Sequence, residues 1–264
     1  MLTRDYRLMP SVKAAVTHAR SHGVQIMLAT ARGPAALDIV LDDLGEVDFA
    51  ICFGGALVLE RRSGRWLPAL RERITLAIAD VKDVWAKAQA LGIALGAYTE
   101  SGVYIGGASS WFEAEFSHTG EPVFRTPFDA VPDPIFKLLA IVDPMRVVDL
   151  ERLRMSLPPS VDGVYSHANY LEIMVRGVSK GDALERFCGS RGINQQLVVV
   201  TGDGDNDVSM FLAAGHSAAM PLASPSARAA AKWIVPADAP AGVAAVITHY
   251  ASLLWRIPAP PLNP

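Results

Sequence analysis

The stretch Leu197–Asp207, with the sequence LVVVTGDGDND, is the most informative part of this 264-residue chain. Its four leading apolar residues, three of them valine, predict a short buried strand over 197–200. Glycines and carboxylates follow directly, and residues 206–214 are predicted to form a helix that Gly215 ends. A buried strand that leads through a polar, glycine-rich turn into a helix is typical of an open α/β sheet.

The same alternation of strands and helices occurs at both ends of the chain. Toward the N-terminus, the sequence predicts a helix over 10–22, a strand over 24–29, a helix over 34–44 and a strand over 49–53. Toward the C-terminus, it predicts a helix after Ser179, the strand over 197–200, a strand over 217–220, a helix from Ser224-Pro225 and an edge strand over 233–235. Short connections between such elements require parallel strands, so we expect an α/β fold with a Rossmann-like parallel sheet.

The middle of the chain lacks this alternation. It contains long helical stretches over 74–91 and 147–157 and aromatic strands around Tyr98 and Tyr104, with further strands over 136–142 and 170–175. None of these elements leads into a turn that combines glycine with several carboxylates. We therefore expect residues 73–175 to form an inserted α+β cap domain, and residues 1–72 and 176–264 to form one discontinuous core.

Composition narrows the class of protein. Hydrophobic residues make up 51% of the chain and charged residues 19%, the balance of a folded globular protein, and the formal net charge is -3. No basic stripe is present, so we expect no nucleic-acid partner. No apolar run reaches the roughly 18 residues of a membrane-spanning helix, and the first residues lack the apolar core of a signal peptide, so we expect a cytoplasmic protein without membrane contact.

The two cysteines, Cys52 and Cys188, lie in apolar runs and are predicted to be buried, reduced thiols.

Three turns at predicted strand ends carry the candidate site residues, which are Thr30 and Arg32, Gly54, and the acidic turn over 203–207. The carboxyl ends of parallel strands meet at one rim of the sheet, where ligands bind. Three carboxylates and one amide in five residues repel one another unless a cation or a bound donor offsets the repulsion. Magnesium prefers a few carboxylate oxygens together with water and a phosphate. The alternative is an acidic turn that only caps the following helix, where Asp and Asn are common.

Lys180 directly follows the candidate N-cap Ser179, so its ammonium and the free amides of that helix can face one anion. A lone lysine in this position is more often a solvated surface residue. Likewise, Thr30 can be a strand-end hydroxyl bonded to nearby backbone. Arg32 can grip a phosphate with two hydrogen bonds or be a solvated arginine.

The order of these features resembles the haloacid dehalogenase superfamily. LATAR at 28–32 looks like the second motif of that family, YLEIMVRGVSKG at 170–181 like its third, and GDGDND at 202–207, continued by Met210 and Ala214-Gly215, like its fourth. A large insertion between the second and third motifs is similar to the Cof-like branch of the superfamily. The resemblance covers nearly the whole chain.

The resemblance implies a phosphatase that acts on small phosphorylated metabolites, such as sugar phosphates, with Mg²⁺ as cofactor. In this family an aspartate attacks phosphorus, and water then hydrolyses the aspartyl-phosphate. The implied catalytic residues are Thr30, Lys180 and Asp207, the substrate-binding residues are Thr30, Arg32, Gly54, Lys180 and Asn206, and the metal ligands are Asp203 and Asp207. The inserted cap is expected to exclude water and to select the leaving group.

The first motif of the family, Asp-x-Asp-Gly-Thr, does not occur in this sequence. In the family, the first aspartate of this motif is the nucleophile and the second is the acid/base. Residues 2–5, LTRD, resemble the sequence that follows the motif in the family. We expect that the natural reading frame starts upstream, the alternative being a truncated relative, and that the chain as written has little or no activity. The strand that carries this motif lies in the family between the strands that end at Thr30 and Asp203, so both are expected to have unpaired edges. A non-catalytic phosphometabolite-binding protein and a phosphomutase are the alternative functions.

Two smaller departures concern the substrate side of the site. Gly54 replaces a usual asparagine, and Met220-Pro221-Leu222 replaces a usual methionine-glycine-asparagine. Proline removes a backbone amide there, so we expect substrate contacts that differ from those of the family.

Overall fold

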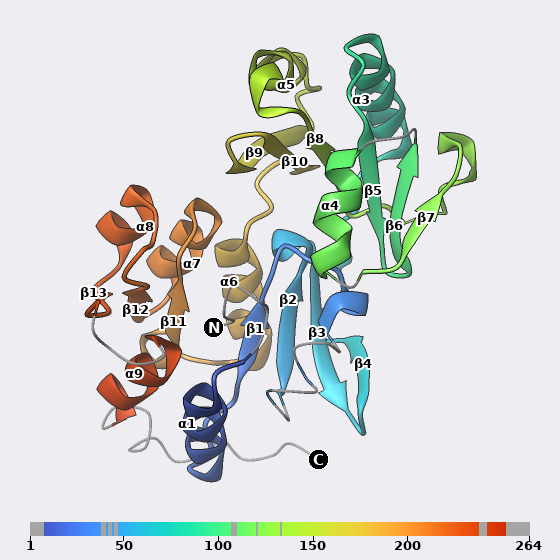
Figure 1. The fold of residues 1–264 in the computed structure, drawn as a ribbon. Helices are drawn as coiled ribbons and strands as arrows, with labels where there is room; N and C mark the ends of the chain where they lie inside the picture. The colour runs from blue at the N-terminus through green and yellow to red at the C-terminus, as the bar shows by residue number, and fades with distance from the viewer. Residues whose placement is uncertain are drawn as a thin grey trace.

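The computed structural model describes residues 8–37, 41, 44, 47–106, 110–119, 121–132, 134–237 and 242–251. The strands of these residues form three sheets, of four, six and three strands (Figure 1). Two of the sheets contain the parallel strands that the sequence predicts, and helices cover them, so the α/β fold is confirmed. No helix in these ranges is both long and apolar enough to cross a membrane.

The N-terminal half of the core begins with α1 (Pro10–Ser21), which buries Val12, Val16 and Ala19 along one helical face. β1 (Met27–Ala29) pairs in parallel with β2 (Phe49–Cys52). β3 (Leu57–Arg62) and β4 (Arg65–Pro68) then form an antiparallel hairpin, which the sequence analysis did not predict. Of the predicted helix over 34–44, the structure describes a 3₁₀ turn at Pro34–Ala36 and a few further residues, and the rest lies outside the described ranges.

The C-terminal half of the core repeats the alternation of helix and parallel strand. Its elements are α6 (Lys180–Arg191), β11 (Val199–Gly202), α7 (Val208–Ala213), β12 (His216–Ala219), α8 (Pro225–Ala230), β13 (Trp233–Ile234) and α9 (Gly242–His249). The three strands are parallel in the order β11-β12-β13. The strand predicted over 197–200 begins two residues later, because Gln195–Leu197 form a 3₁₀ turn whose N-cap, Asn194, accepts a hydrogen bond from the Gln196 amide.

The inserted part of the chain has its own six-stranded sheet. Its elements are α3 (Ile78–Ala90), β5 (Leu95–Thr99), β6 (Gly102–Gly106), α4 (Ser110–Thr119), β7 (Val123–Arg125), β8 (Lys137–Ile141), α5 (Val147–Met155), β9 (Val161–His167) and β10 (Tyr170–Val175). The strand order is β7-β6-β5-β8-β10-β9, and every pair except β6 and β7 is antiparallel. All of these elements lie within 73–175, while the domain boundaries at 72/73 and 175/176 stay predictions.

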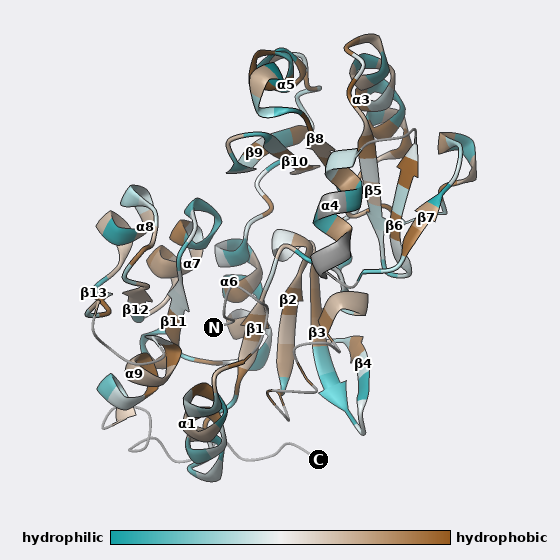
Figure 2. Ribbon diagram, in the orientation of Figure 1, coloured by the Kyte–Doolittle hydropathy of each residue, from teal (hydrophilic) through white to brown (hydrophobic). Residues whose placement is uncertain are grey.

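Hydropathy follows this arrangement (Figure 2). β2 is hydrophobic along its length and all four of its residues are buried, whereas the far end of β3, Glu60-Arg61-Arg62, is hydrophilic and leaves the core. Phe49 and Ile51 of β2 pack in one cluster with residues of α6 and with Val200 of β11, so a single apolar core joins the two core sheets. Among the described strands, β1 and β11 each pair with a neighbour on one side only.

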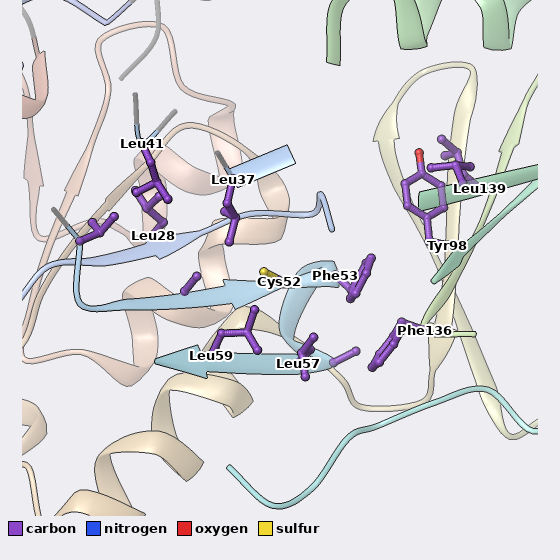
Figure 3. Close-up of a cluster of buried hydrophobic side chains, with 14 of the residues drawn as sticks. Leu28, Leu37, Leu41, Cys52, Phe53, Leu57, Leu59, Tyr98, Phe136 and Leu139 are labelled. Carbon is purple, nitrogen blue, oxygen red and sulfur yellow. The ribbon is translucent and has the colours of Figure 1, made fainter. Parts of the chain in front are cut away.

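A second apolar cluster joins the core to the cap (Figure 3). Leu28, Cys52 and Leu57 contribute from the core, and Tyr98 and Leu139 contribute from the cap. Between them, the rings of Phe53 and Phe136 stack with centroids 4.7 Å apart and an interplanar angle of 11°. The cap therefore rests on the core through buried side chains.

Both cysteines are buried free thiols, as the sequence predicts. Burial raises the pKa of the Cys52 thiol far above its ordinary value, and burial also raises the pKa of Cys188. Both sulfur atoms are therefore expected to be unreactive at neutral pH.

Candidate active site

Lys180 lies at the N-terminus of α6, where Ser179 caps the helix by accepting a hydrogen bond from the Asp182 amide at 3.1 Å. The Lys180 side chain is buried, and its Nζ donates to Oδ1 of Asp207 at 2.6 Å. Both side chains are 7% exposed. Lys180 is therefore not the solvated surface lysine that the sequence left as an alternative.

Asp207 holds the acidic turn together. Its second oxygen, Oδ2, accepts hydrogen bonds from the backbone amides of Asp203 at 2.9 Å and Gly204 at 3.1 Å. Gly202 makes room for this carboxylate, because a Cβ at that position would lie 2.2 Å from Oδ2. The turn thus carries one buried ion pair, and both oxygens of its carboxylate accept hydrogen bonds.

The other two carboxylates of the turn have different surroundings. Oδ1 of Asp205 accepts hydrogen bonds from the hydroxyls of Ser224 and Ser226, and these bonds lower the pKa of the carboxyl group. Asp203 is exposed, and its carboxylate has no hydrogen-bond partner among the described residues. Hydrogen-bond donors therefore offset the negative charges of Asp205 and Asp207. The carboxylate of Asp203 remains open to a ligand.

The loop after β1 lies on β2 and the 3₁₀ turn Phe53–Gly55. The Thr30 amide donates to Ile51 O at 2.8 Å, and Thr30 O accepts from the Gly54 amide at 3.0 Å. The hydroxyl of Thr30 accepts from the Arg32 amide at 3.0 Å, which leaves its own hydrogen for another acceptor. Thr30, Arg32 and Gly54 are therefore neighbours, as the sequence predicts for one rim.

Gly55 connects this loop to Lys180. Its φ is 123°, and a Cβ there would lie 2.2 Å from Ser179 O, so only glycine fits between the 3₁₀ turn and the start of α6. Gly55 and Gly202 each make room for a neighbouring part of the site, a role that their place in glycine-rich turns does not reveal. The turn that follows β2 therefore lies directly against the start of α6, where Lys180 is the first helical residue.

A pocket of about 330 Å³ opens beside the acidic turn. It is lined by Asp203–Asn206 together with Leu222 and Ser224 from the core, and by Tyr165, Ser166 and His167 from β9 of the cap. Asn206 therefore lies at the pocket, and its role in substrate binding stays a prediction. β9 was not predicted from the sequence, where the available signal was the polar pair Ser166-His167.

The donor set at this pocket can be compared with the needs of a metal ion. Within the described ranges, no group of three or more His, Cys, Asp or Glu side chains could hold a metal ion. Magnesium usually takes one or two carboxylates and completes its shell with water and substrate phosphate, whereas zinc and calcium take more protein ligands. The open carboxylate of Asp203 beside Asp207 therefore fits Mg²⁺ better than a metal enclosed by protein.

A parallel-stranded α/β core with a cap inserted over a lysine–aspartate site defines a hydrolase of the haloacid dehalogenase type. The sequence model of the haloacid dehalogenase-like hydrolases matches residues 1–247, and the chain belongs to this family, in its Cof-like branch. A predicted phosphatase of Streptococcus pyogenes serotype M6 is 26% identical over 257 residues, which are 95% of this chain and 94% of that protein.

Solved structures share the fold. A haloacid dehalogenase-like hydrolase from Bacteroides thetaiotaomicron superimposes with a TM-score of 0.82 at 18% identity and covers 94% of both chains. A sugar phosphatase of subclass IIB of the superfamily superimposes with a TM-score of 0.80 at 19% identity and covers 93% of both chains. At these identities the similarity establishes the architecture of core and cap.

Proposed function

We propose that the site hydrolyses phosphate monoesters of small phosphorylated metabolites, such as sugar phosphates, with Mg²⁺ as cofactor. The observation that carries this proposal is the buried Lys180–Asp207 pair next to the open carboxylate of Asp203. A fixed positive charge beside an open carboxylate suits a phosphoryl group bridged to a cation, since phosphoryl transfer depends mainly on positioning and electrostatic stabilisation.

Each predicted residue has a role in this proposal. Thr30 donates its free hydroxyl hydrogen to a phosphoryl oxygen, and Lys180 offsets negative charge that develops during transfer. Arg32, Gly54 and Asn206 contact the substrate at the rim. Asp203 would ligate Mg²⁺, and Asp207, which accepts hydrogen bonds from Lys180 and two backbone amides, would support the metal. When bound, Mg²⁺ neutralises charge on the phosphoryl oxygens.

The pocket favours a small polar leaving group. Its volume is about 330 Å³, and Ser166, His167 and Ser224 offer hydrogen-bonding groups on both its cap and core sides. A sugar or another polyhydroxylated group satisfies such a lining better than an apolar one does. The structural relative in subclass IIB is a sugar phosphatase, which supports the same substrate class for this chain. A cytoplasmic location stays part of the proposal.

The test uses residues 1–264 preceded by a strand that ends in Asp-x-Asp-Gly-Thr, because residues 1–264 do not contain that motif. We expect this protein to hydrolyse p-nitrophenyl phosphate and a panel of sugar phosphates with Mg²⁺ and to lose turnover in EDTA. Asp203→Asn should lower kcat by about 10²-fold or more, since it removes the open carboxylate. Asp205→Asn is the matched control, because that carboxylate faces Ser224 and Ser226, and it should retain most activity. Activity without Mg²⁺, or equal losses in the two variants, would refute the proposed role of Asp203.

A second candidate is phosphometabolite binding without turnover, which the lack of an Asp-x-Asp-Gly-Thr sequence in residues 1–264 favours for this chain by itself. We expect calorimetry with the same sugar phosphates and Mg²⁺ to give heats of binding with no release of inorganic phosphate. Folded protein that binds none of them would exclude this candidate.

A further inference from the structure

A buried lysine of the cap contacts the core loop of residues 30–33. We call this segment the phosphate-side loop, because Thr30 and Arg32 are assigned to the phosphate. Lys137 is the first residue of β8, and its side chain is 3% exposed. Its Nζ donates to the carbonyl of Ala31 at 2.7 Å and to Oε2 of Glu172 at 3.3 Å. The same ammonium lies 4.3 Å from the ring centroid of Tyr98, which is close enough for a cation–π contact.

A second buried cap residue contacts the same loop. Oε1 of Glu121 accepts a hydrogen bond from the Gly33 amide at 2.8 Å. The cap thus supplies partners for the backbone at Ala31 and Gly33, on either side of Arg32. The core supplies partners for both backbone groups of Thr30, and the Phe53 amide donates to Arg32 O at 3.0 Å. Four residues of loop are therefore shaped by the core and the cap together.

The chemistry of these contacts indicates that Lys137 positions the loop rather than stabilises the folded protein. A buried ion pair such as Lys137–Glu172 contributes little net stability compared with apolar side chains of the same size, because both charges must leave water. Lys137 is also the one charged residue of β8, a strand in which every residue is buried, and it follows the buried Phe136. A charged donor gives a short, directed hydrogen bond that an apolar residue cannot give. The hydrogen bond from Lys137 to the Ala31 carbonyl is such a directed bond.

We propose that Lys137, oriented by Glu172, is a positioning residue that holds the Ala31 carbonyl and thereby keeps Thr30 and Arg32 directed at the phosphate. Docking of the cap and shaping of the phosphate-side loop are then one event. This inference rests on the proposed function in one respect, the assignment of Thr30 and Arg32 to phosphate.

Two variants separate the effect of Lys137 on the position of the loop from its effect on the stability of the protein. Lys137→Met leaves Glu172 buried without a counter-charge, so its Tm should fall. Lys137→Met with Glu172→Leu removes both charges, so most of the Tm should return. Lys87→Met is the matched control in the cap, because Lys87 likewise donates to a carboxylate, Asp83 at 2.6 Å, and to a carbonyl, Ser156 O at 2.6 Å.

Two readouts are taken on residues 1–264. Hydrogen exchange of the peptide that contains residues 28–37 reports on the loop, and calorimetry with inorganic phosphate and Mg²⁺ reports on the anion site. In the double variant we expect the loop amides to exchange about 10- to 100-fold faster and the Kd for phosphate to rise by a similar factor, even though the Tm has recovered. Lys87→Met should leave both readouts unchanged.

The outcomes distinguish this inference from the proposed function. If the double variant recovers phosphate affinity together with its Tm, Lys137 is a structural residue and the inference is overturned. Unchanged loop exchange in the double variant overturns it as well. If the unmodified chain binds no phosphate but loop exchange rises in the double variant, the positioning of the loop by Lys137 is supported and the proposed phosphate site fails.

Discussion

The pairing of Lys180 with Asp207 is the central contact of the site at the scale of single residues. Asp207→Asn would leave the buried ammonium without a counter-charge, and we expect this to lower the free energy of unfolding by about 3–5 kcal/mol. Urea unfolding measures the loss. Asp205→Asn, on the exposed side of the same turn, should have a much smaller effect, and equal losses would contradict the central role of the ion pair.

Glu121 gives the protein a pH dependence that can be measured. Burial raises the pKa of its carboxyl group above the ordinary 4.5, and the Gly33 amide, Lys137 and Arg32 only partly offset this rise. The folded state therefore binds the proton more tightly than the unfolded state does. The stability that this group contributes is present below pH 4.5 and is lost as the pH rises through the folded pKa.

Glu121→Gln retains an acceptor for the Gly33 amide and removes the titration. We therefore expect the variant to gain stability relative to the parent protein as the pH rises from 4.5 to neutrality. Urea midpoints at several pH values measure this difference. Glu113→Gln, which alters an exposed residue of α4 paired with Arg125, is the control and should show no such trend.

Single residues also show why the sequence revealed only part of the site. Lys180 follows the N-cap Ser179, and Asp207 stands in an acidic turn, so short motifs singled out both residues. The family resemblance then supplied their roles, which stay predictions. Lys137 and Glu121 meet loop residues that are 106 and 88 positions away, and no local pattern predicts such contacts. The signal available for Lys137 was one charge inside an otherwise apolar strand over 136–142.

At the scale of elements, the contact between the 3₁₀ turn Phe53–Gly55 and α6 sets the position of Lys180. Gly55→Ala adds a Cβ at 2.2 Å from Ser179 O at a φ of 123°, so we expect a loss of about 2–5 kcal/mol in unfolding free energy. Gly177→Ala is the matched control, since its φ is 79° and no atom lies within 4 Å of the new Cβ. It should cost about 1–2 kcal/mol for the backbone alone. Thermal unfolding of both variants measures the difference, and similar costs would contradict the close approach.

The helices whose N-cap residues are evident in the sequence were predicted well. Ser179 and Ser224 cap α6 and α8 by accepting bonds from Asp182 and Ala227, as their side chains and positions indicate. β9 was missed because its seven residues mix polar and apolar side chains and only Val161 is fully buried. The helix–strand boundary before β11 shifted by two residues, since apolar periodicity does not separate a 3₁₀ turn from a strand over so few residues.

At the scale of the whole molecule, the stacked rings of Phe53 and Phe136 join core and cap. Phe136→Ala should lower the free energy of unfolding by about 3–5 kcal/mol and separate the calorimetric transition into two steps, because core and cap each retain an apolar cluster. Phe124→Ala removes a ring that stacks on Tyr104 but is 40% exposed, so it should cost less and keep one transition. A single transition in both variants would contradict the joining role.

The order of elements alone predicted a parallel-stranded core interrupted by an α+β insertion, and the bounds of the insertion stay predictions. The alternation of helix and strand at both ends predicted parallel pairing, and β1 with β2 and β11 with β12 confirm it. The docking of the cap did not follow, because it depends on aromatic and charged side chains from distant segments. The sequence therefore predicted the direction of strand pairing in the core, but not which side chains of the cap contact the core.

The two ends of the described chain also meet, because α1 packs against α9 (Figure 1). A pulling force applied to the ends of the chain would act first on this helix pair. The cap would carry no load until the core on both sides of it had opened, since it is inserted between the two halves of the core. Under tension, the lysine–aspartate site would therefore be lost before the cap sheet that covers it.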